Sequence, residues 1–367
     1  MAYGTISADV IQSSVTGVSL GAGNDTRFKN RLINGNYLVD QYNAGASITP
    51  TSGQYVIDRW FWQQSVVGKF TFQQNAGSVT PPAGYTNYAG YTVATAYTVT
   101  SGDYFIHQQK IEGLNVSDLA WGTANAQTIT LSFWVRSSLT GTFGGALLNS
   151  AANRDYVFSY TINSANTWEQ KSITIAGDTT GTWLTTNGIG IWLRLSLGAG
   201  STYIGTPGSW QTTAYLAPTG QVNVAGTSGA TFYITGVQLE VGSSATGFDL
   251  RDYGTELILS QRYYTYINGA TGNWSGASSA TFFCPLSVAL RAVPAMAYTG
   301  TQNGQSQGVN TFTTTTQPSG INVFGAASGT GIQTAKIDFG LTGFTGAGVV
   351  NTACILFGTT ISVSSEL

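Results

Sequence analysis

A short string in this sequence has the spacing of a hydrolase nucleophile. A G-x-S-x-G pattern spans residues 304–308, centred on Ser306. Such a serine works on a sharp strand-to-helix turn, with a histidine and an acid within reach. Here the string lies in a segment rich in Gln, Asn and Gly with no helical pattern after it. The single histidine, His107, alternates with Phe105 and Ile111 along an apolar face. The sequence therefore predicts no Ser-His catalytic site.

Metal and acid–base chemistry have few candidate residues. A zinc site needs three or four His, Cys or carboxylate ligands, and the chain supplies one His and two distant Cys. Neither a G-x-G-x-x-G string nor a phosphate-binding loop occurs. Paired carboxylates for glycosidase chemistry remain the one enzymatic option, and the candidates are Asp58, Glu112, Asp118, Asp155 and Glu169. Because the sequence places no two of them at a working separation, we expect no enzyme activity, no catalytic residue, no metal and no cofactor.

Two segments combine strand alternation with outward-facing aromatic and cationic residues. Residues 129–136 and 189–195 alternate between apolar and other residues, as half-buried strands do. On the face opposite the apolar one they present Trp134 and Arg136 in the first, and Trp192 and Arg194 in the second. Rings and guanidinium groups on a non-core face are enriched at contact surfaces. They predict either a platform for sugar rings or a surface covered by a loop or by another subunit.

Two long loops, residues 75–91 and 198–220, hold more aromatic rings than turn sequences usually do. Their rings belong to Tyr85, Tyr88, Tyr203, Trp210 and Tyr215. Loops on a rigid scaffold are common recognition sites, so these rings either stack on sugar faces or attach each loop to its own domain. The strands and loops together give the candidate carbohydrate-binding residues Tyr203, Trp210, Tyr215, Trp134, Arg136, Trp192 and Arg194.

Charge and hydropathy exclude several classes of protein. Charged residues make up 8% of the 367 residues, with a net charge of −2, and they form no basic cluster for nucleic acid. No run of about 18 apolar residues is present, so we expect no membrane insertion. Outward aromatic residues on so weakly charged a surface favour a homo-oligomer. Cys284 and Cys354 both lie in apolar runs. These positions are compatible with two buried free thiols and also with a disulfide.

The elements that position these residues are mostly short strands. From residue 30 to residue 252 short alternating strands are broken by Gly, Asn, Thr and Pro, which predicts an all-β sandwich. A one-residue slip in the alternation beside Gly236 predicts a β-bulge. Thr255 as N-cap and Glu256 in the first turn then predict a short helix.

The remaining boundaries follow from changes in the pattern. The helix lies in a connector, residues 253–265, and residues 266–367 return to strand and turn. They predict a smaller C-terminal β-sandwich domain. Residues 1–29 have too few apolar residues to fold alone and are expected to become ordered against a partner chain or to fray.

Several strings carry a family resemblance. They read NRLINGNYLVDQYNAG, YVIDRWFW, LSFWVRSS, NTWEQKSITI and FYITGVQLEVGSSATGFDLRDYGTELILSQRYY, with a weaker echo in CPLSVALRAVP. They resemble tail-fibre and virion-appendage proteins of tailed bacteriophages and prophages, whose large domain is a jelly roll similar to carbohydrate-binding modules.

The resemblance implies a jelly-roll β-sandwich and a receptor-binding role at a host surface glycan. It also implies a place on the virion after synthesis in the host cytoplasm, attachment to another virion protein through residues 1–29, and assembly as a trimer. Two alternatives stay open: a structural or decoration protein of capsid or tail without host recognition, and a glycan hydrolase.

Overall fold

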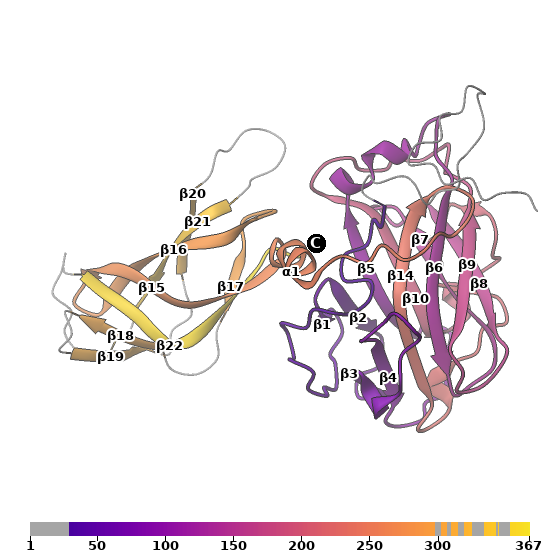
Figure 1. Cartoon of the computed structure of the whole chain (residues 1–367), viewed down its shortest axis with the longest axis horizontal. Helices are drawn as coiled ribbons and strands as arrows, with labels where there is room; N and C mark the ends of the chain where they lie inside the picture. The colour runs from indigo at the N-terminus through magenta and orange to yellow at the C-terminus, as the bar shows by residue number, and fades with distance from the viewer. Residues whose placement is uncertain are drawn as a thin grey trace, which may run out of the picture.

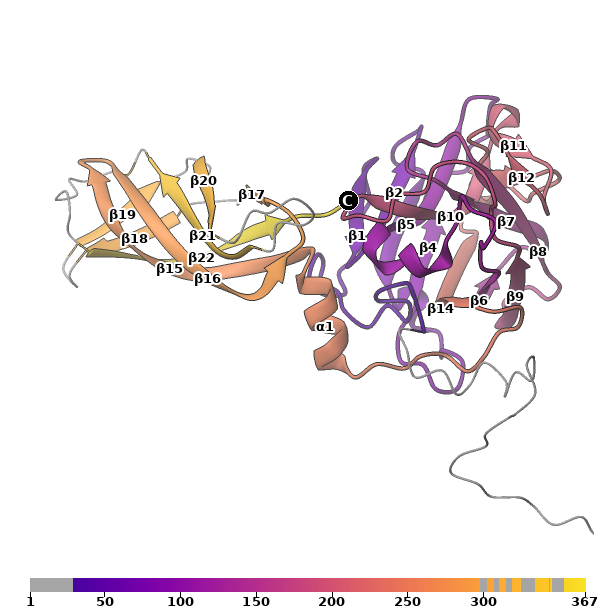
Figure 2. The same cartoon turned by 90° about the horizontal axis from the view of Figure 1, so that it is seen from above.

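The computed structural model describes residues 29–297, 302–306, 310–314, 319–324, 334–342, 344 and 353–367. These residues form a larger and a smaller β unit joined by one helix, and the smaller unit projects away from the larger (Figures 1 and 2). Apart from Lys29, the predicted attachment segment lies outside the described residues. In the described part of the chain, no helix is long and apolar enough to cross a membrane.

The larger unit is a sandwich of two antiparallel sheets. The seven-stranded sheet has the order β1 (Gln54–Ile57), β2 (Trp60–Gln64), β5 (Tyr104–Glu112), β10 (Ile189–Ala199), β7 (Gly141–Leu148), β8 (Asp155–Ile162) and β12 (Trp210–Gln211). The five-stranded sheet has the order β3 (Phe70–Gln74), β4 (Ala89–Val93), β14 (Thr231–Val241), β6 (Ile129–Ser137) and β9 (Glu169–Ile175). The predicted all-β, jelly-roll class is confirmed.

Short elements complete the larger unit. β11 (Ile204–Gly205) and β13 (Ala217–Pro218) form a parallel pair within the long loop that follows β10. Single 3₁₀ turns occur at Ala76–Ser78, Gly113–Asn115, Ser117–Leu119, Ser201–Tyr203 and Val224–Gly226.

The core lies between the two sheets because each strand turns one set of alternate residues inward. On β6 the buried set is the predicted one, Ile129, Leu131, Phe133 and Val135. On β10 the inward set includes Ile191, Leu193 and Leu195, whereas Ile189 at the strand's start is only half-buried. The core also encloses Trp60, Trp62 and Phe105, with His107 among them.

The predicted bulge is present at Gly236. The register of β14 against β6 shifts between Thr235 and Gln238, and Gly236 has a φ of 62°. A side chain there would be strained, and its Cβ would lie 2.6 Å from the Tyr85 hydroxyl. The bulge therefore requires glycine, and it reverses the phase of burial along the strand.

The helix begins earlier than predicted. α1 spans Tyr253–Gln261, and its N-cap is Asp252, whose side chain accepts a hydrogen bond from the Thr255 backbone N–H. Thr255 is therefore inside the first turn, and its prediction as N-cap was wrong. A carboxylate three residues upstream satisfies the same orphan N–H and also interacts favourably with the helix dipole. Glu256 does lie in the first turn.

The smaller unit is one curled sheet of eight strands, not the second sandwich that was predicted. Its order is β19 (Asn310–Thr314), β18 (Gln302–Ser306), β22 (Ala353–Ser364), β15 (Tyr264–Gly276), β16 (Ser279–Leu290), β21 (Thr334–Leu341) and β20 (Ser319–Phe324), with β17 (Ala295–Ala297) beside β22.

Its longest strands explain how one sheet can enclose a core. β15, β16 and β22 have 13, 12 and 12 residues, and twist accumulates over such lengths. A bulge at Gly269, with a φ of 101°, bends β15 further. The sheet thereby curls around Trp274, Phe282 and Phe339. Cys284 and Cys354 are both free thiols.

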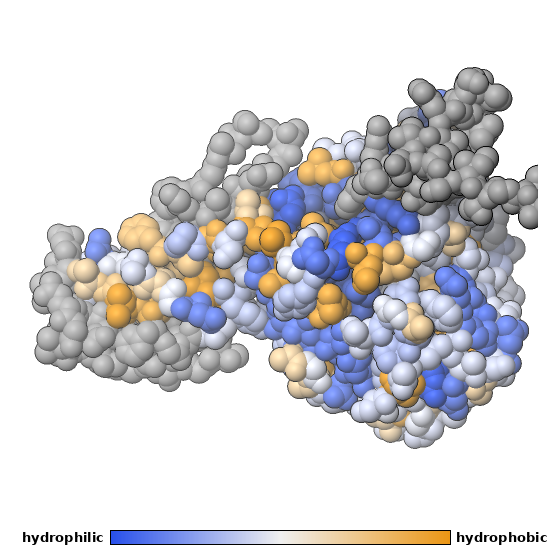
Figure 3. All heavy atoms as spheres, in the orientation of Figure 1, coloured by the Kyte–Doolittle hydropathy of each residue, from blue (hydrophilic) through white to orange (hydrophobic). Residues whose placement is uncertain are grey.

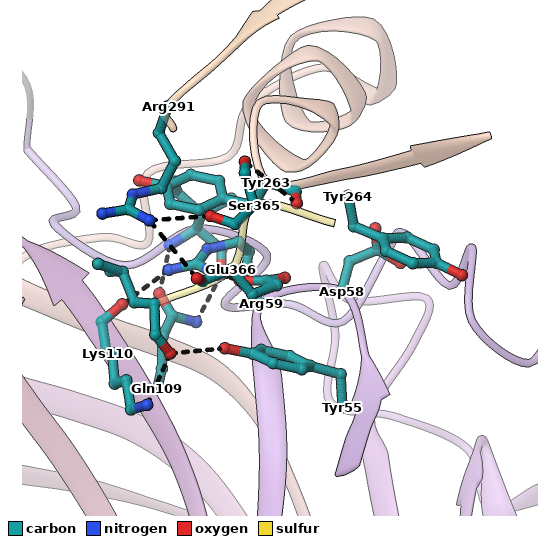
Figure 4. A network of polar contacts seen from close by, with 12 residues as sticks. Tyr55, Asp58, Arg59, Gln109, Lys110, Tyr263, Tyr264, Arg291, Ser365 and Glu366 are labelled. Atoms are coloured by element: carbon teal, nitrogen blue, oxygen red, sulfur yellow. Dashed lines mark hydrogen bonds and ion pairs between the residues drawn. The ribbon is translucent and has the colours of Figure 1, made fainter. Parts of the chain in front are cut away.

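A buried polar network joins the two units (Figure 4). Glu112, at the end of β5, is 1% exposed. It accepts hydrogen bonds from the Tyr263 hydroxyl at 2.9 Å and from Arg262 at 3.1 Å, just after α1. Arg59 of the larger unit forms an ion pair with Glu366 and lies 3.5 Å from the centre of the Tyr263 ring. The C-terminal residues thus return to the sandwich.

Candidate functional site

The two predicted Trp-Arg pairs lie on opposite outer faces of the sandwich. Trp134 and Arg136 project from β6 of the five-stranded sheet, and Trp192 and Arg194 project from β10 of the seven-stranded sheet. The whole core separates the two sheets. These four residues therefore belong to two surfaces and cannot form one site.

A loop covers the surface around Trp134. Burial raises the pKa of the Tyr85 hydroxyl, and a hydrogen bond with the Trp134 side chain opposes that rise. Arg136 donates from Nε to the Asn166 carbonyl at 2.9 Å and lies 5.5 Å from the centre of the Tyr233 ring. Residues of the 75–91 loop pack on the same ring. The rings of this loop attach it to its own domain.

Trp210 also has a structural role. Its indole N–H donates to the Ala176 carbonyl at 2.8 Å. Its ring makes edge contacts with Trp121, Trp183 and Tyr156, at centroid distances of 5.2 to 5.4 Å. Four rings packed edge to face hold the middle of the 198–220 loop against the sandwich. Trp210 is therefore a poor candidate for ligand contact.

Tyr203 and Tyr215 lie at the seven-stranded sheet, on the side of Trp192. Tyr203 is half-buried and meets Tyr104 edge-on at 5.3 Å. Tyr215 packs in a small apolar cluster that includes Trp192 and lies outside the main core. The structure thus brings these two predicted residues to the face of Trp192 and Arg194, and keeps Trp134 and Arg136 away.

Strand register defines the centre of this face. Phe61 of β2 pairs with Gln108 of β5, and Gln108 pairs with Arg194 of β10. In the adjacent row, Lys110 pairs with Trp192. Because these positions alternate with core residues, their side chains share the outer side of the sheet. We call Phe61, Gln108, Lys110, Trp192 and Arg194 the Trp192 face.

Two cations surround the Trp192 ring. The Arg194 guanidinium carbon is 3.7 Å from the ring centre, and the Lys110 ammonium is 4.9 Å from it. Lys110 also lies 4.8 Å from the Phe61 ring, which stacks near Trp192 at 6.2 Å. Cations at these distances are attracted by the faces of aromatic rings. The Trp192 ring is therefore fixed in position while part of it remains exposed.

The polar groups of this face are not fully satisfied. Burial lowers the pKa of Arg194 to about 10. Burial, followed by the charges of Arg194, Arg59 and Arg291, lowers the pKa of Lys110 to about 8. The indole nitrogen of Trp192 and the Oε1 atom of Gln108 are buried without a hydrogen-bond partner. The Trp192 ring is therefore partly available for stacking, as in a binding site, while these unsatisfied polar atoms lie beneath the surface.

The candidate carboxylates are each engaged in local structure. Asp58 and Glu112 are buried and bonded to Gln41 and Tyr263 respectively. Glu169 binds Lys171 at 2.6 Å, and Asp155 accepts from the Thr213 N–H at 3.1 Å. Asp118 pairs with Arg31. The five serve separate contacts on different elements.

The other chemical candidates are placed as follows. Ser306 is in strand β18, where it pairs with Asn310 and Cys354, and residues 307–309 lie outside the described residues. Within the described part, no group of three or more His, Cys, Asp or Glu side chains could hold a metal. His107 lies in the core between two tyrosine hydroxyls.

Sequence reasoning missed Phe61, Gln108 and Lys110. Phe61 lies between Trp60 and Trp62, so it must face away from the core if they face in. Gln108 and Lys110 alternate with His107 in the same way. This signal was readable, but only the pairing of β2, β5 and β10 places these residues beside Trp192.

Comparison with known proteins gave only distant structural likenesses. No family model and no curated protein matches the chain. One similar structure is the enzymatically active domain of tailspike protein 4 of bacteriophage CBA120, with 12% identity and a TM-score of 0.31 over 58% of this chain. The chain spans 21% of that structure's length.

Two further similar structures are smaller proteins matched over nearly their full length. A putative sugar binding protein from Bacteroides thetaiotaomicron has 13% identity and a TM-score of 0.34, over 58% of this chain and 100% of that one. A family 11 carbohydrate-binding module from Clostridium thermocellum, in complex with a mixed-linked tetrasaccharide, has 12% identity and a TM-score of 0.26, over 56% and 100%. Similarity this low transfers neither ligands nor activities to this chain.

Proposed function

We propose that this protein is a non-catalytic adhesion protein of a phage virion that binds host surface glycans through the Trp192 face. The main observation is a partly exposed Trp ring held on a rigid sheet between Arg194 and Lys110. A fixed indole offers a flat apolar surface to a sugar ring, and neighbouring polar groups can orient the sugar hydroxyls.

The placement on a virion rests on the sequence resemblance and on composition. A surface with 8% charged residues and the tail-fibre-like strings support an appendage made in the host cytoplasm and assembled on the particle through residues 1–29. In a trimer, several weak glycan sites would act together and gain about 10²–10⁴ in avidity.

The test is glycan binding by Trp192→Ala. We expect the variant to lose at least about 10-fold in affinity for host surface polysaccharide, because a central aromatic anchor is removed. Titration calorimetry on the full chain measures this. Trp134→Ala is the matched control, and its affinity per folded molecule should equal that of the wild type. Equal loss in both variants, or oligosaccharide released from the polysaccharide, would contradict the proposal.

One observation favours a second function, a structural or decoration role. Phe283 and Ile355 of the smaller unit are 45% and 44% exposed. Both pair with Thr271, so they lie in one row across three strands. Exposed apolar rows of this kind mark assembly contacts. An assembly role predicts that loss of the protein changes particle integrity while adsorption per intact particle is unchanged.

A further inference from the structure

Arg194 differs from the other buried arginines in having no polar partner. It is 8% exposed, and among the described residues no hydrogen bond or ion pair reaches its guanidinium. Its Nε atom is buried and unsatisfied. By contrast, Arg59 pairs with Glu366 and Arg31 pairs with Asp118 at 2.6 Å. Instead, its guanidinium carbon lies 3.7 Å from the centre of the Trp192 ring.

A buried cation without a counter-ion is costly for the folded state. Contact with a ring recovers only part of the hydration that burial removes. Buried charged groups that lack a compensating contact are typical of functional sites. Arg194 therefore has the features of a residue kept for a ligand rather than for stability.

A second cation lies beside the same ring. The Lys110 ammonium is 4.9 Å from the centre of the Trp192 ring and donates to the main-chain oxygen of Leu367 at 2.6 Å. No Asp or Glu of the described chain forms an ion pair with either Arg194 or Lys110. Although the whole chain has a net charge of −2, the charge of Arg194 has no anionic partner among the described residues, and such a charge attracts an anion.

We propose that the Trp192 face binds a glycan bearing an anionic substituent, a carboxylate or a phosphate, with Arg194 holding the anion beside a sugar stacked on Trp192. This inference rests on the proposed glycan binding and names the chemical class of the ligand. The planar guanidinium presents parallel N–H donors that match both anions. The adjoining ring explains why the anion belongs to a sugar rather than to free phosphate.

The experiment is a glycan array probed with the full chain at low and high salt. The array holds neutral, uronate-containing and phosphorylated glycans, with carboxyl-reduced and dephosphorylated forms of the same polymers. We expect wild type to bind an anionic glycan and to lose at least about 10-fold when its charged group is removed or salt is raised. Comparing the carboxyl-reduced with the dephosphorylated glycans shows whether the bound anion is a carboxylate or a phosphate.

Two variants of Arg194 distinguish its contribution to binding from that of the other positive charges of the protein. Arg194→Gln should lose at least about 10-fold on the anionic glycan and show a weaker salt dependence, and Arg194→Lys should keep part of both. Arg136→Gln, the same Trp-x-Arg spacing on the opposite face, is the control and should bind as wild type does. Thermal unfolding of Arg194→Gln should occur at the same or a higher temperature than wild type, because a buried unpaired charge is removed.

Each outcome decides between the two proposals. Binding that requires Trp192 but is equal for charged and neutral forms overturns the anionic ligand and leaves glycan adhesion standing. An Arg194→Gln protein that unfolds well below the wild-type temperature indicates a structural role and also overturns it. An array without any bound glycan contradicts the proposed function and removes the basis of both.

Discussion

At the scale of single residues, the sandwich core contains a histidine whose protonation is disfavoured by burial. His107 is fully buried, and its two ring nitrogens lie 3.0 and 2.9 Å from the hydroxyls of Tyr37 and Tyr91. Trp60 stacks on it at 4.7 Å. Burial lowers the pKa of His107 to about 3. The imidazole is therefore neutral in the folded state and acts as a satisfied core residue.

Burial makes Asp58 contribute to the pH dependence of stability in the opposite direction. Burial raises the pKa of its carboxyl to about 7, although hydrogen bonds from Gln41 oppose that rise. In the unfolded chain a His has a pKa of about 6.5 and an Asp a pKa of about 3.9. Between about pH 4 and 6.5, the unfolded state binds the His107 proton and the folded state binds the Asp58 proton. His107 thus makes stability rise with pH, whereas Asp58 makes it fall.

We predict that substitutions at these two residues change the pH profile in opposite directions. Relative to wild type, His107→Gln should lose unfolding free energy as pH rises from 4.5 to about 6.5, and Asp58→Asn should gain it over the same range. Urea unfolding at four pH values measures both. Parallel profiles for wild type and either variant would show that the group does not titrate differently on folding.

At the scale of elements, two strands of the smaller unit expose apolar side chains. Phe283 on β16 and Ile355 on β22 flank Thr271 on β15. They border an open hollow of about 410 Å³ that Pro285 and Gly269 also line. Hydrophobic residues are visible over this unit, beside a more hydrophilic larger unit (Figure 3). A second copy of the chain could cover this row, in line with the proposed homo-oligomer.

We predict that Phe283→Ser combined with Ile355→Ser lowers the oligomeric mass of the purified chain to that of a monomer, because the apolar contact is lost. Light scattering at micromolar concentration measures it. Val67→Ser is the control, since Val67 is 64% exposed on the larger unit and should leave the mass unchanged. A wild-type protein that is already a monomer would refute the assembly.

At the scale of the whole molecule, buried charges fix the two units to one another. Glu112 of the sandwich binds Tyr263 and Arg262 and lies 3.9 Å from Arg291. Removing one partner of a buried charge network leaves the others uncompensated. The junction therefore determines how the smaller unit projects from the sandwich.

We predict that Glu112→Ala costs about 3–5 kcal/mol of unfolding free energy. The matched control is Asp118→Ala, which removes an ion pair with Arg31 whose acidic side chain is 56% exposed, and it should cost less than about 1 kcal/mol. Urea unfolding followed by far-UV and aromatic signals measures both. If Glu112→Ala costs no more than the control, the network does not couple the units.

Local patterns determined much of this fold. Alternation along residues 129–136 predicted the buried set of β6 because period-two burial is a property of a single strand. Gly236 marked the bulge because only glycine fits its backbone. The N-cap was misplaced because both Asp252 and Thr255 have suitable side chains, and only the helix geometry selects between them.

What the tertiary structure alone decided was which residues meet. The sequence gives Trp134 and Trp192 the same local pattern, yet one bonds to Tyr85 of a loop and the other lies beside two cations. It also cannot distinguish two packed sheets from one curled sheet in the smaller unit. Strand partners and loop positions depend on contacts between residues far apart in the chain. Alternation fixes the face on which a residue lies, whereas pairing and packing fix its neighbours, and the neighbours set its charge environment.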